Sequence, residues 1–443
     1  MEPTRSEGVA ARADNTGVVR GCQVESATVR SFLRLVGRPR FGWATAETTV
    51  AGGGAAATLS ATNENRFRNI RERADSLLSG LEIANTLPDV AQPRLYGGFS
   101  FTTREQNGRW SGFPSASFVL PSVQLAVTPE EAWLTSIAVE PDAQTTATAQ
   151  LERWRDRLAA LPEIEPTAPP GIDALSSTPT RDRWRTQVTR AVERIRAGDL
   201  RKVVLAQSLT ATLGREAVPA DILARLSVPY PDCDRFLFAP ADGGTFFGAT
   251  PERLVTVTDG RVTTEALAGS IGRGDTEHED EWLAQELQQS EKNRHEQELV
   301  VEAIRDQLST VATDIEIGTR DIRKLATVQH LRTPIRAQLD ADVHVLELVE
   351  ALHPTPAVGG LPPDDALATI RETEAFDRGW YAAPVGWFDA DGNGTFSVAI
   401  RSGIAAGKSV TMFAGAGIVA DSNPDQEWDE VQLKYRPVLD ELS

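Results

Sequence analysis

The chain is poor in lysine, in cysteine and in long apolar runs, and each scarcity excludes something. Only five of its 45 basic residues are lysine, at positions 202, 292, 324, 408 and 434, so the other forty are arginine. Two cysteines, Cys22 and Cys233, are too few and too distant for a disulfide framework or a zinc cluster. No apolar run approaches the roughly 18 residues of a membrane-spanning helix, and because charges interrupt residues 1–40 every few positions we expect no signal peptide there. We therefore expect a soluble cytoplasmic protein.

Acidic side chains outnumber basic ones, because 63 Asp and Glu against 45 Lys and Arg give a net charge of −18. Such a chain repels phosphate backbones and anionic lipid surfaces, so neither nucleic acid nor a membrane is an expected partner. We expect a monomer. An acidic surface with little lysine also suggests the hypothesis that the source is a halophile.

With 443 residues and 41% hydrophobic content, the chain is long enough for one large domain or two closely joined halves. The Pro/Ser/Thr-rich segment 165–180 is the best linker candidate, and it separates an N-terminal half (1–180) from a C-terminal half (181–443). The first half favours sheet with sparse helices, predicted at 65–81 and 149–161. The second half begins with a helix at 181–197, capped by Gly198, and carries a long charged helix from about 280 to 308.

The stretch 413–434 (FAGAGIVADSNPDQEWDEVQLK) contains most of the chemistry visible in one place. Glycines at 415 and 417 end an apolar strand and allow a ligand to approach the backbone. Asn423 is a good N-cap for the helix that follows. On that helix Glu427, Glu430 and Lys434 share one face. A solvated charged face is the alternative interpretation.

Four further side chains are candidates, each with an ordinary structural alternative. Lys202 opens a strand, and in so arginine-rich a chain a lysine indicates an amine that can give up its proton, with chance occurrence of lysine as the alternative. Glu252 begins a hairpin that turns at 259–260 and could be an acid of raised pKa, or could cap a turn. Glu296 lies on the long charged helix, where a glutamate is normally solvent-facing. His330 lies in a buried-type strand, where a core histidine is more common than a ligand.

The segment 389–394 (DADGNG) begins like an EF-hand loop, but Ile400 occupies the twelfth position, where a bidentate Glu belongs. We therefore expect a hairpin turn between Trp387 and Phe396, and no calcium site.

Nine motifs occur along the chain in the order RKVVLAQ, FFGATPERL, TEALAGS, KNRHEQELVV, VQHLRTPI, HPTPAVGGLP, RGWYAAPVGWF, FSVAIRSG and the 413–434 stretch. In these motifs the chain resembles the chorismate-using enzymes, specifically the isochorismate synthases. The resemblance is dense over residues 181–440, with PRLYGGFSF at 93–101 as its one clear upstream match. It implies an α/β (α+β) fold: one unit built as a sandwich of two mostly antiparallel sheets with outer helices, as in anthranilate synthase component I. Both halves of the chain would contribute to this fold.

The resemblance also implies roles. Lys202 matches the base that activates water, and Glu252 the acid that protonates the departing hydroxyl. Glu296 and Glu427, with Glu430 close by, match a Mg²⁺ site. Because Gln297 stands where the family has histidine, Glu298 competes with Glu296, and the register favours Glu296. The positions matching substrate-binding residues are Gly269, Ser270, His330, Tyr381, Arg401, Gly415, Gly417 and Lys434.

Two places indicate which reaction the chain performs. Relatives that use ammonia typically lack the base lysine, whereas this chain has Lys202. The loop 357–363 reads AVGGLPP, where salicylate and anthranilate synthases carry Thr-x-Ser-Gly-x-Pro-Lys. We expect isochorismate synthase activity on chorismate, for menaquinone biosynthesis. A salicylate synthase and an inactive chorismate-binding regulatory protein are the alternatives.

Overall fold

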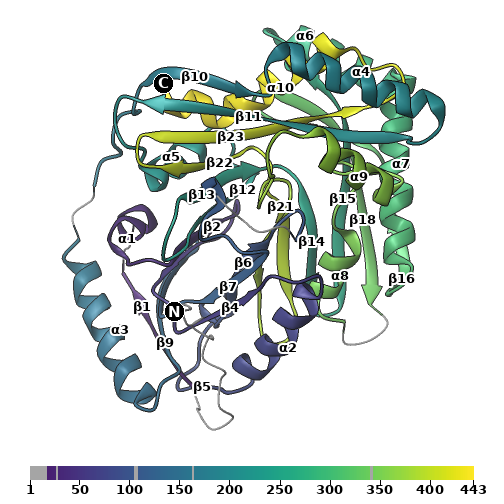
Figure 1. Ribbon diagram of the computed structural model, residues 1–443. Helices are drawn as coiled ribbons and strands as arrows, with labels where there is room; N and C mark the ends of the chain where they lie inside the picture. The colour runs from purple at the N-terminus through teal and green to yellow at the C-terminus, as the bar shows by residue number, and fades with distance from the viewer. Residues whose placement is uncertain (1–16, 26–27, 104–107, 162–163, 340–342) are drawn as a thin grey trace, which may run out of the picture.

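Two large β-sheets face each other and share one core in the computed structural model, which describes every residue except 1–16, 26–27, 104–107, 162–163 and 340–342 (Figure 1). Neighbouring strands are antiparallel apart from β1 and β5. The predicted sandwich of mostly antiparallel sheets with outer helices is confirmed.

The first sheet has thirteen strands within the described residues. In spatial order they are β10 (Ile172–Thr178), β11 (Lys202–Leu213), β23 (Ser409–Ile418), β22 (Ser402–Ala406), β13 (Thr245–Thr250), β12 (Asp234–Ala239), β2 (Arg40–Ala44), β3 (Thr49–Gly53), β8 (Val123–Val127), β9 (Ala132–Ala138), β1 (Gly17–Val24) and β5 (Leu81–Ile83), with β19 (Gly360–Leu361) paired to β11.

The second sheet has ten strands in the same part of the chain. Their order is β16 (Ala312–Ile317), β18 (Val328–Leu339), β15 (Arg261–Gly272), β14 (Arg253–Thr258), β21 (Gly394–Val398), β20 (Pro384–Phe388), β6 (Leu95–Phe99), β7 (Ala116–Leu120) and β4 (Ala57–Ala61), with β17 (Asp321–Lys324) paired to β18.

The helices lie on the outside of the sheets. They are α1 (Val29–Leu35), α2 (Arg66–Leu78), α3 (Ala143–Ala159), α4 (Arg181–Ala197), α5 (Pro219–Leu226), α6 (Glu277–Gln289), α7 (Glu291–Leu308), α8 (Val345–Leu352), α9 (Pro363–Thr373) and α10 (Pro424–Leu439), with short 3-10 turns at η1 (Asp89–Ala91), η2 (Gly108–Trp110) and η3 (Asp440–Leu442). Figure 1 shows α4 and α10 along the top and α7 beside β15 and β18.

Strands from both sides of residue 180 occur in each sheet, because β2 pairs with β12 and β6 pairs with β20. The linker prediction for 165–180 is wrong in its second part. Residues 172–178 form β10, which pairs with β11 at the edge of the first sheet. No helix in the described residues has the length and apolarity needed to cross a membrane.

Three helix predictions need correction or adjustment. The charged helix expected from about 280 to 308 is two helices, because Ser290 interrupts it and caps α7 by accepting from the backbone N–H of Asn293. The helix expected at 149–161 begins earlier, at Ala143, and that expected at 65–81 ends at Leu78. The helix at 181–197 is confirmed, with Gly198 as a left-handed C-cap.

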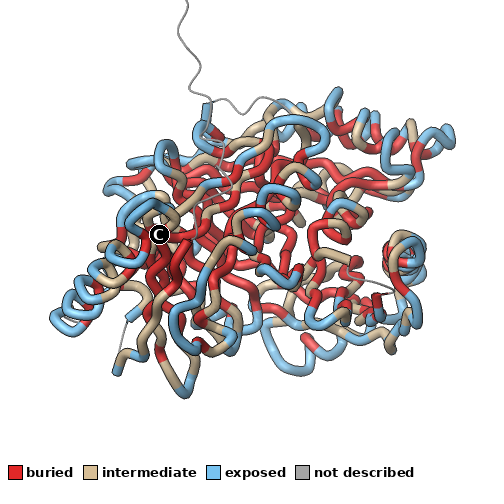
Figure 2. The backbone as a smooth tube through the Cα atoms, turned by 90° about the horizontal axis from the view of Figure 1, so that it is seen from below, coloured by how far each residue is buried: buried red, intermediate tan, exposed pale blue. Residues whose placement is uncertain are grey.

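Aromatic and aliphatic side chains from both sheets fill the core. Phe41 of β2 stacks on Tyr96 of β6 with 3.9 Å between ring centroids, which joins the two sheets directly. Gly97 is required at the same place, since a Cβ atom there would lie 1.9 Å from the carbonyl oxygen of Ser117. Figure 2 shows the buried residues concentrated in the central strands and the exposed ones on the outer helices and loops.

Candidate active site

One cavity of about 210 Å³ gathers every side chain that the sequence predicted for the site. The elements that supply it are β11, β15, β18, β23, α7 and α10, which lie together in the upper right of Figure 1. A larger open groove of about 570 Å³ beside α3 contains none of them. The predicted residues that line the cavity are Lys202, Glu252, Gly269, Ser270, Glu296, His330, Tyr381, Arg401, Gly415, Gly417, Glu427, Glu430 and Lys434.

Lys202, the first residue of β11, points into the cavity and forms an ion pair with Glu296 of α7. Its Nζ lies 2.8 Å from Oε1 of Glu296, and the two side chains are 1% and 16% exposed. A Cβ atom on Gly417 would lie 2.9 Å from Cε of Lys202 and 3.2 Å from the same carboxylate oxygen. The glycine in β23 therefore provides the space in which this pair forms.

The side chains around Glu296 settle which glutamate of this helix faces the cavity. Gln297 is fully buried and donates to the hydroxyl of Thr333, so it packs under the helix. Glu298 is on the exposed side and pairs with Arg320 at 3.0 Å. Successive helical residues point about 100° apart, so only Glu296 of the two candidates lines the cavity.

Helix α10 presents the second group of charges. As predicted, Asn423 caps it, accepting from the backbone N–H groups of Asp425 and Gln426. Lys434 Nζ lies 2.6 Å from Glu430 and donates to the carbonyl oxygen of Gly415 at 2.8 Å.

Glu427 is buried on the same helix, and within the described residues no cationic group pairs with it. Burial, with the neighbouring Glu430, raises the pKa of Glu427 to about 7. A hydrogen bond with Ser422 and the charges of Lys292 and Lys434 oppose this rise without cancelling it.

Glu252 occupies the opposite part of the cavity, on the two-residue link between β13 and β14. Burial raises the pKa of its carboxyl to about 7, and the nearby Glu265 adds to the rise, while Lys202 and Arg401 oppose it. The hydroxyl of Thr355 donates to Oε1 at 3.5 Å. The expectation of a raised-pKa acid at this position is supported by its surroundings.

A hydroxyl–imidazole pair lies on β15 and β18. Ser270 Oγ and His330 Nδ1 are 2.8 Å apart, at a bulge where Gly269 takes a φ of +73°. Burial, followed by the charges of Arg401 and Lys434, holds the pKa of His330 well below its usual value, so the ring is neutral. Nε2 of His330 is buried and has no partner in the described part of the chain.

Arg401 and Tyr381 form the remaining wall. Arg401 is buried at 6% exposure with a φ of +51°, so its backbone conformation is one that side-chain-bearing residues rarely adopt. Its guanidinium carries the positive charge on this side of the cavity, and burial lowers its pKa. Burial raises the pKa of Tyr381 to about 12, so its hydroxyl remains a hydrogen-bond donor.

Several lining residues were not predicted. Lys292 is the most informative, because with Lys202 and Lys434 it makes three of the chain's five lysines neighbours of one cavity. The scarcity of lysine was the signal that could have identified it. The remaining unpredicted residues are Val204, Pro251, Leu267, Ala268, Asn293, Ala357, Val358 and Ile400.

Comparison with known proteins agrees with this geometry. A family profile described as "Chorismate binding enzyme" matches residues 21–443. The chain is 39% identical over 410 residues to the "Salicylate biosynthesis isochorismate synthase" of Pseudomonas aeruginosa, covering 90% of this chain and 84% of that one. It is 34% identical to the "Isochorismate synthase MenF" of Bacillus subtilis, covering 95% and 92%. The chain belongs to the isochorismate synthases, within the chorismate-binding enzymes.

Solved structures give the same picture of the fold. The menaquinone-specific isochorismate synthase MenF of Escherichia coli superimposes with a TM-score of 0.82 at 26% identity, over 97% of this chain and 96% of that one. Anthranilate synthase component I of Streptococcus pneumoniae superimposes with a TM-score of 0.70 at 19% identity, over 99% and 95%, which shows a shared fold.

The carboxylates of the cavity were tested as metal ligands. Across the described ranges, no three His, Cys, Asp or Glu side chains stand close enough to form a metal cluster. However, Mg²⁺ is usually held by one or two carboxylates together with water and substrate oxygens. Glu296 and Glu427 supply oxygen donors from two helices, and the buried Glu427, which has no ion pair within the described residues, is the kind of group that a cation stabilises. The donor set therefore fits Mg²⁺.

Proposed function

We propose that this isochorismate synthase converts chorismate to isochorismate with Lys202 as base and Glu252 as acid. The observation that carries the proposal is the placement of an amine and a raised-pKa carboxyl in one cavity, the amine at the start of β11 and the carboxyl on the link between β13 and β14. A base and an acid on opposite faces of a ring are what the reaction requires.

In this reaction water adds to C2 of the ring and the C4 hydroxyl departs. Lys202, as the neutral amine, takes a proton from the attacking water as the C2–O bond forms, and this proton must return to Glu252 before the next turnover. Glu252 gives its proton to the departing oxygen as the C4–O bond breaks, and the ring double bonds shift between the two carbons. One water enters and one leaves, so the change is an isomerisation and is reversible.

The other lining residues bind the two carboxylates of chorismate. Arg401 and Lys434 supply positive charge, and the hydroxyl of Tyr381 and the backbone amides near Gly415 and Gly417 supply hydrogen bonds. We assign the neutral His330 a hydrogen bond to substrate through its unpaired Nε2, and Ser270 and the amide at Gly269 lie beside it.

We propose Mg²⁺ as the cofactor, held by Glu296 and Glu427 with Glu430 close by. When bound, the ion supplies positive charge against a carboxylate of the substrate, which the glutamates alone would repel. Glu296 also pairs with Lys202, and Glu430 with Lys434.

We further propose that the enzyme works as a cytoplasmic monomer and that its product serves menaquinone biosynthesis. The MenF of Bacillus subtilis and the menaquinone-specific MenF of Escherichia coli support this pathway, whereas the name of the Pseudomonas relative points to salicylate. Disrupting the gene and measuring menaquinone and salicylate in the cells distinguishes the two. Light scattering on the purified protein tests the oligomeric state.

The activity is tested by incubating the protein with chorismate and Mg²⁺ and separating the products by chromatography. We expect isochorismate without salicylate. Salicylate with released pyruvate would assign a salicylate synthase, and unchanged chorismate would indicate a binding or regulatory protein. Glu252→Gln, which keeps the shape of the side chain but has no acidic proton, should make neither product.

A further inference from the structure

Glu252 stands at a point where the chain passes from one sheet to the other. Strand β13 of the first sheet ends at Thr250, strand β14 of the second begins at Arg253, and only Pro251 and Glu252 connect them. No ladder of strand hydrogen bonds runs through this link. The position of the acid therefore depends on whatever fixes the two strand ends.

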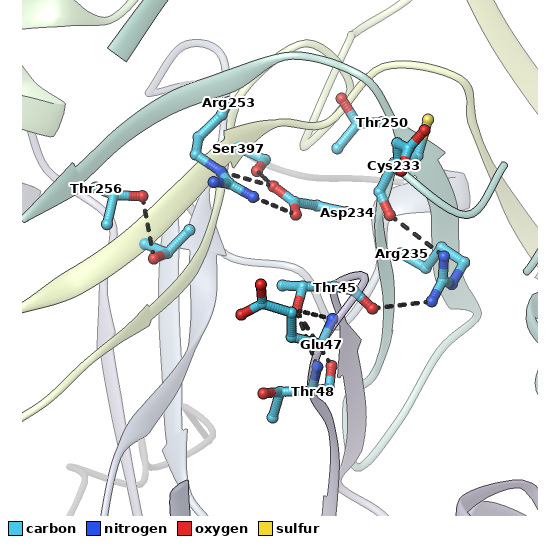
Figure 3. Close-up of polar contacts among 12 residues, drawn as sticks. Thr45, Glu47, Thr48, Cys233, Asp234, Arg235, Thr250, Arg253, Thr256 and Ser397 are labelled. Carbon is cyan, nitrogen blue, oxygen red and sulfur yellow. Dashed lines mark hydrogen bonds and ion pairs between the residues drawn. The ribbon is translucent and has the colours of Figure 1, made fainter. Parts of the chain in front are cut away.

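Asp234, the first residue of β12, connects these strand ends. In the first sheet it lies opposite Thr250, and in the second sheet Arg253 lies opposite Ser397. The Asp234 carboxylate accepts from Arg253 Nη2 at 2.8 Å and Nε at 3.2 Å, and from the hydroxyl of Ser397 at 2.6 Å (Figure 3). One carboxylate of the first sheet thus holds two neighbouring strands of the second.

The backbone of Glu252 is held at the same junction. Its N–H donates to the hydroxyl of Thr250 at 3.2 Å, and that hydroxyl donates to the carbonyl oxygen of Val398 at 2.6 Å. The N–H of Val398 in turn donates to the carbonyl oxygen of Glu252 at 2.9 Å. Val398 follows Ser397, which Asp234 binds, and Thr250 lies opposite Asp234 in the first sheet, so moving either strand end moves the acid.

The Asp234 side chain is 5% exposed and does not line the cavity, so it takes no direct part in the chemistry. A buried carboxylate is retained only where donors satisfy it, and here three donors come from the opposite sheet. Arg253, at 40% side-chain exposure, can turn to solvent if its partner is removed.

We propose that Asp234 is a positioning residue for the reaction, holding Glu252 in place through Arg253 and Ser397. This inference rests on the proposed role of Glu252. The alternative is that Asp234 only joins the sheets and contributes to stability without affecting the acid.

A positioning role and a purely structural role for Asp234 predict different pH dependences of the reaction rate in Asp234 variants. The charged and hydroxyl groups facing Glu252 are Glu265 from β15, Lys202 from β11, Arg401 after β21, Tyr381 before β20 and Thr355 before β19. Removing Asp234 alters none of these directly. If Glu252 loses its fixed, desolvated position it moves toward water, and its pKa falls toward the ordinary range. The basic limb of the rate profile then moves to lower pH.

The experiment compares Asp234→Ala and Asp234→Asn with the control Thr256→Val. Thr256 (Figure 3) and Thr395 form a hydroxyl pair on the same two strands, 3.2 Å apart, and Thr256 lies further along β14 from Glu252 than Arg253 does. We expect Asp234→Ala to lower kcat by roughly tenfold to a hundredfold, since small misplacements of catalytic groups have effects of that size. The basic limb should move down by roughly one pH unit.

Asp234→Asn keeps an acceptor for Ser397, so its kcat should lie between that of Asp234→Ala and that of the unmodified protein. The kcat of Thr256→Val should stay within about twofold of the unmodified value. All assays are run below each variant's melting midpoint. A loss of kcat in Asp234→Ala with an unmoved basic limb, or an equal shift in Thr256→Val, would overturn the inference.

A second readout separates this inference from the proposed function. Infrared difference spectra of the carboxyl band, referenced to Glu252→Gln, follow the titration of Glu252 without turnover. We expect a lower midpoint in Asp234→Ala. An unchanged midpoint overturns the positioning role, whereas an unmodified protein that makes no isochorismate overturns the proposed function, whatever the spectra show.

Discussion

Lys202 Nζ lies 2.8 Å from the carboxylate of Glu296, so the proposed base and a proposed metal ligand form one ion pair between a strand and a helix. Both side chains are largely buried, and Gly417 leaves the space they occupy. Lys202 therefore has two proposed roles: its positive charge pairs with Glu296, and its amine accepts a proton from water. A substitution that keeps the charge but not the basicity can separate the two roles.

Replacing Lys202 by Arg tests that separation. Arginine keeps a positive charge beside Glu296 but cannot accept a proton from water. We expect both Lys202→Arg and Lys202→Ala to lower kcat by about a hundredfold or more, the range attributed to general bases. Chorismate binding, measured by calorimetry, should survive in Lys202→Arg.

Lys408→Arg is the matched control, because Lys408 bonds the carbonyl oxygen of Gly214 on the surface. It should retain turnover within about twofold. Near-normal turnover in Lys202→Arg would contradict the assignment of the base.

Metal dependence is tested on two glutamates of one helix. We expect EDTA to remove activity and Mg²⁺ to restore it, and we expect Mg²⁺ to raise the melting temperature of the protein. Glu296→Gln should weaken both effects, because an amide replaces a charged oxygen donor. Glu298→Gln, two residues away and paired with Arg320 on the outside, should weaken neither.

Glu427→Gln should likewise weaken the Mg²⁺-dependent rise in melting temperature. Full activity in a preparation shown to be free of metal would contradict the metal proposal. A larger loss of Mg²⁺ dependence in Glu298→Gln than in Glu296→Gln would identify Glu298 as the ligand in place of Glu296.

Because Glu252 is buried, its ionisation should lower the free energy of unfolding at high pH, so a variant that loses activity can gain stability. Its pKa in the folded protein is about 7, against 4.5 for the unperturbed group. The folded state therefore binds the proton more tightly, and the associated stability is present below about pH 4.5 and lost as the pH rises through about 7. At pH 8 the folded protein carries an ionised carboxylate in a desolvated site.

Glu252→Gln removes that charge. We expect its free energy of unfolding at pH 8 to exceed that of the unmodified protein by on the order of 2 kcal/mol, with a much smaller difference near pH 4. Urea unfolding at the two pH values measures this. Stability curves that stay parallel across the range would show that the carboxyl is not perturbed by the fold.

Salt dependence tests the halophile hypothesis. With a net charge of −18, repulsion among surface carboxylates should decrease as KCl screens it. We expect the melting temperature to rise from low salt to about 1 M, where the screening length is roughly 3 Å. A midpoint that falls steadily over the same series would refute the hypothesis and leave the enzyme assignment untouched.

Strong local signals predicted parts of the fold well. The helix at 181–197 has a clear apolar stripe and a glycine cap, and the turn at 259–260 joins two alternating strands. Two features lacked such signals. Ser290 interrupts a charged helical pattern that continues on both sides, and β10 is an exposed edge strand whose residues show no alternation.

The site was predictable residue by residue only through family resemblance, since its parts come from distant positions. Spacing alone placed Glu427, Glu430 and Lys434 on one helical face, which the structure directs into the cavity. It could not show that Lys202 meets Glu296, because that contact depends on how β11 and α7 pack. For the same reason, the sequence could not show that Lys292 lines the cavity or that Asp234 contacts Arg253 and Ser397.

The burial of lysine around the cavity determines how the protein responds to amine-modifying reagents. Of the five lysine side chains, Lys202, Lys292 and Lys434 line the cavity. Lys202 and Lys434 are only 1% and 12% exposed, whereas Lys292 is exposed, as are Lys324 and Lys408 elsewhere on the protein. An acylating reagent should therefore react first at Lys292, Lys324 and Lys408, and substrate in the cavity should slow the reaction at Lys292 alone among these three.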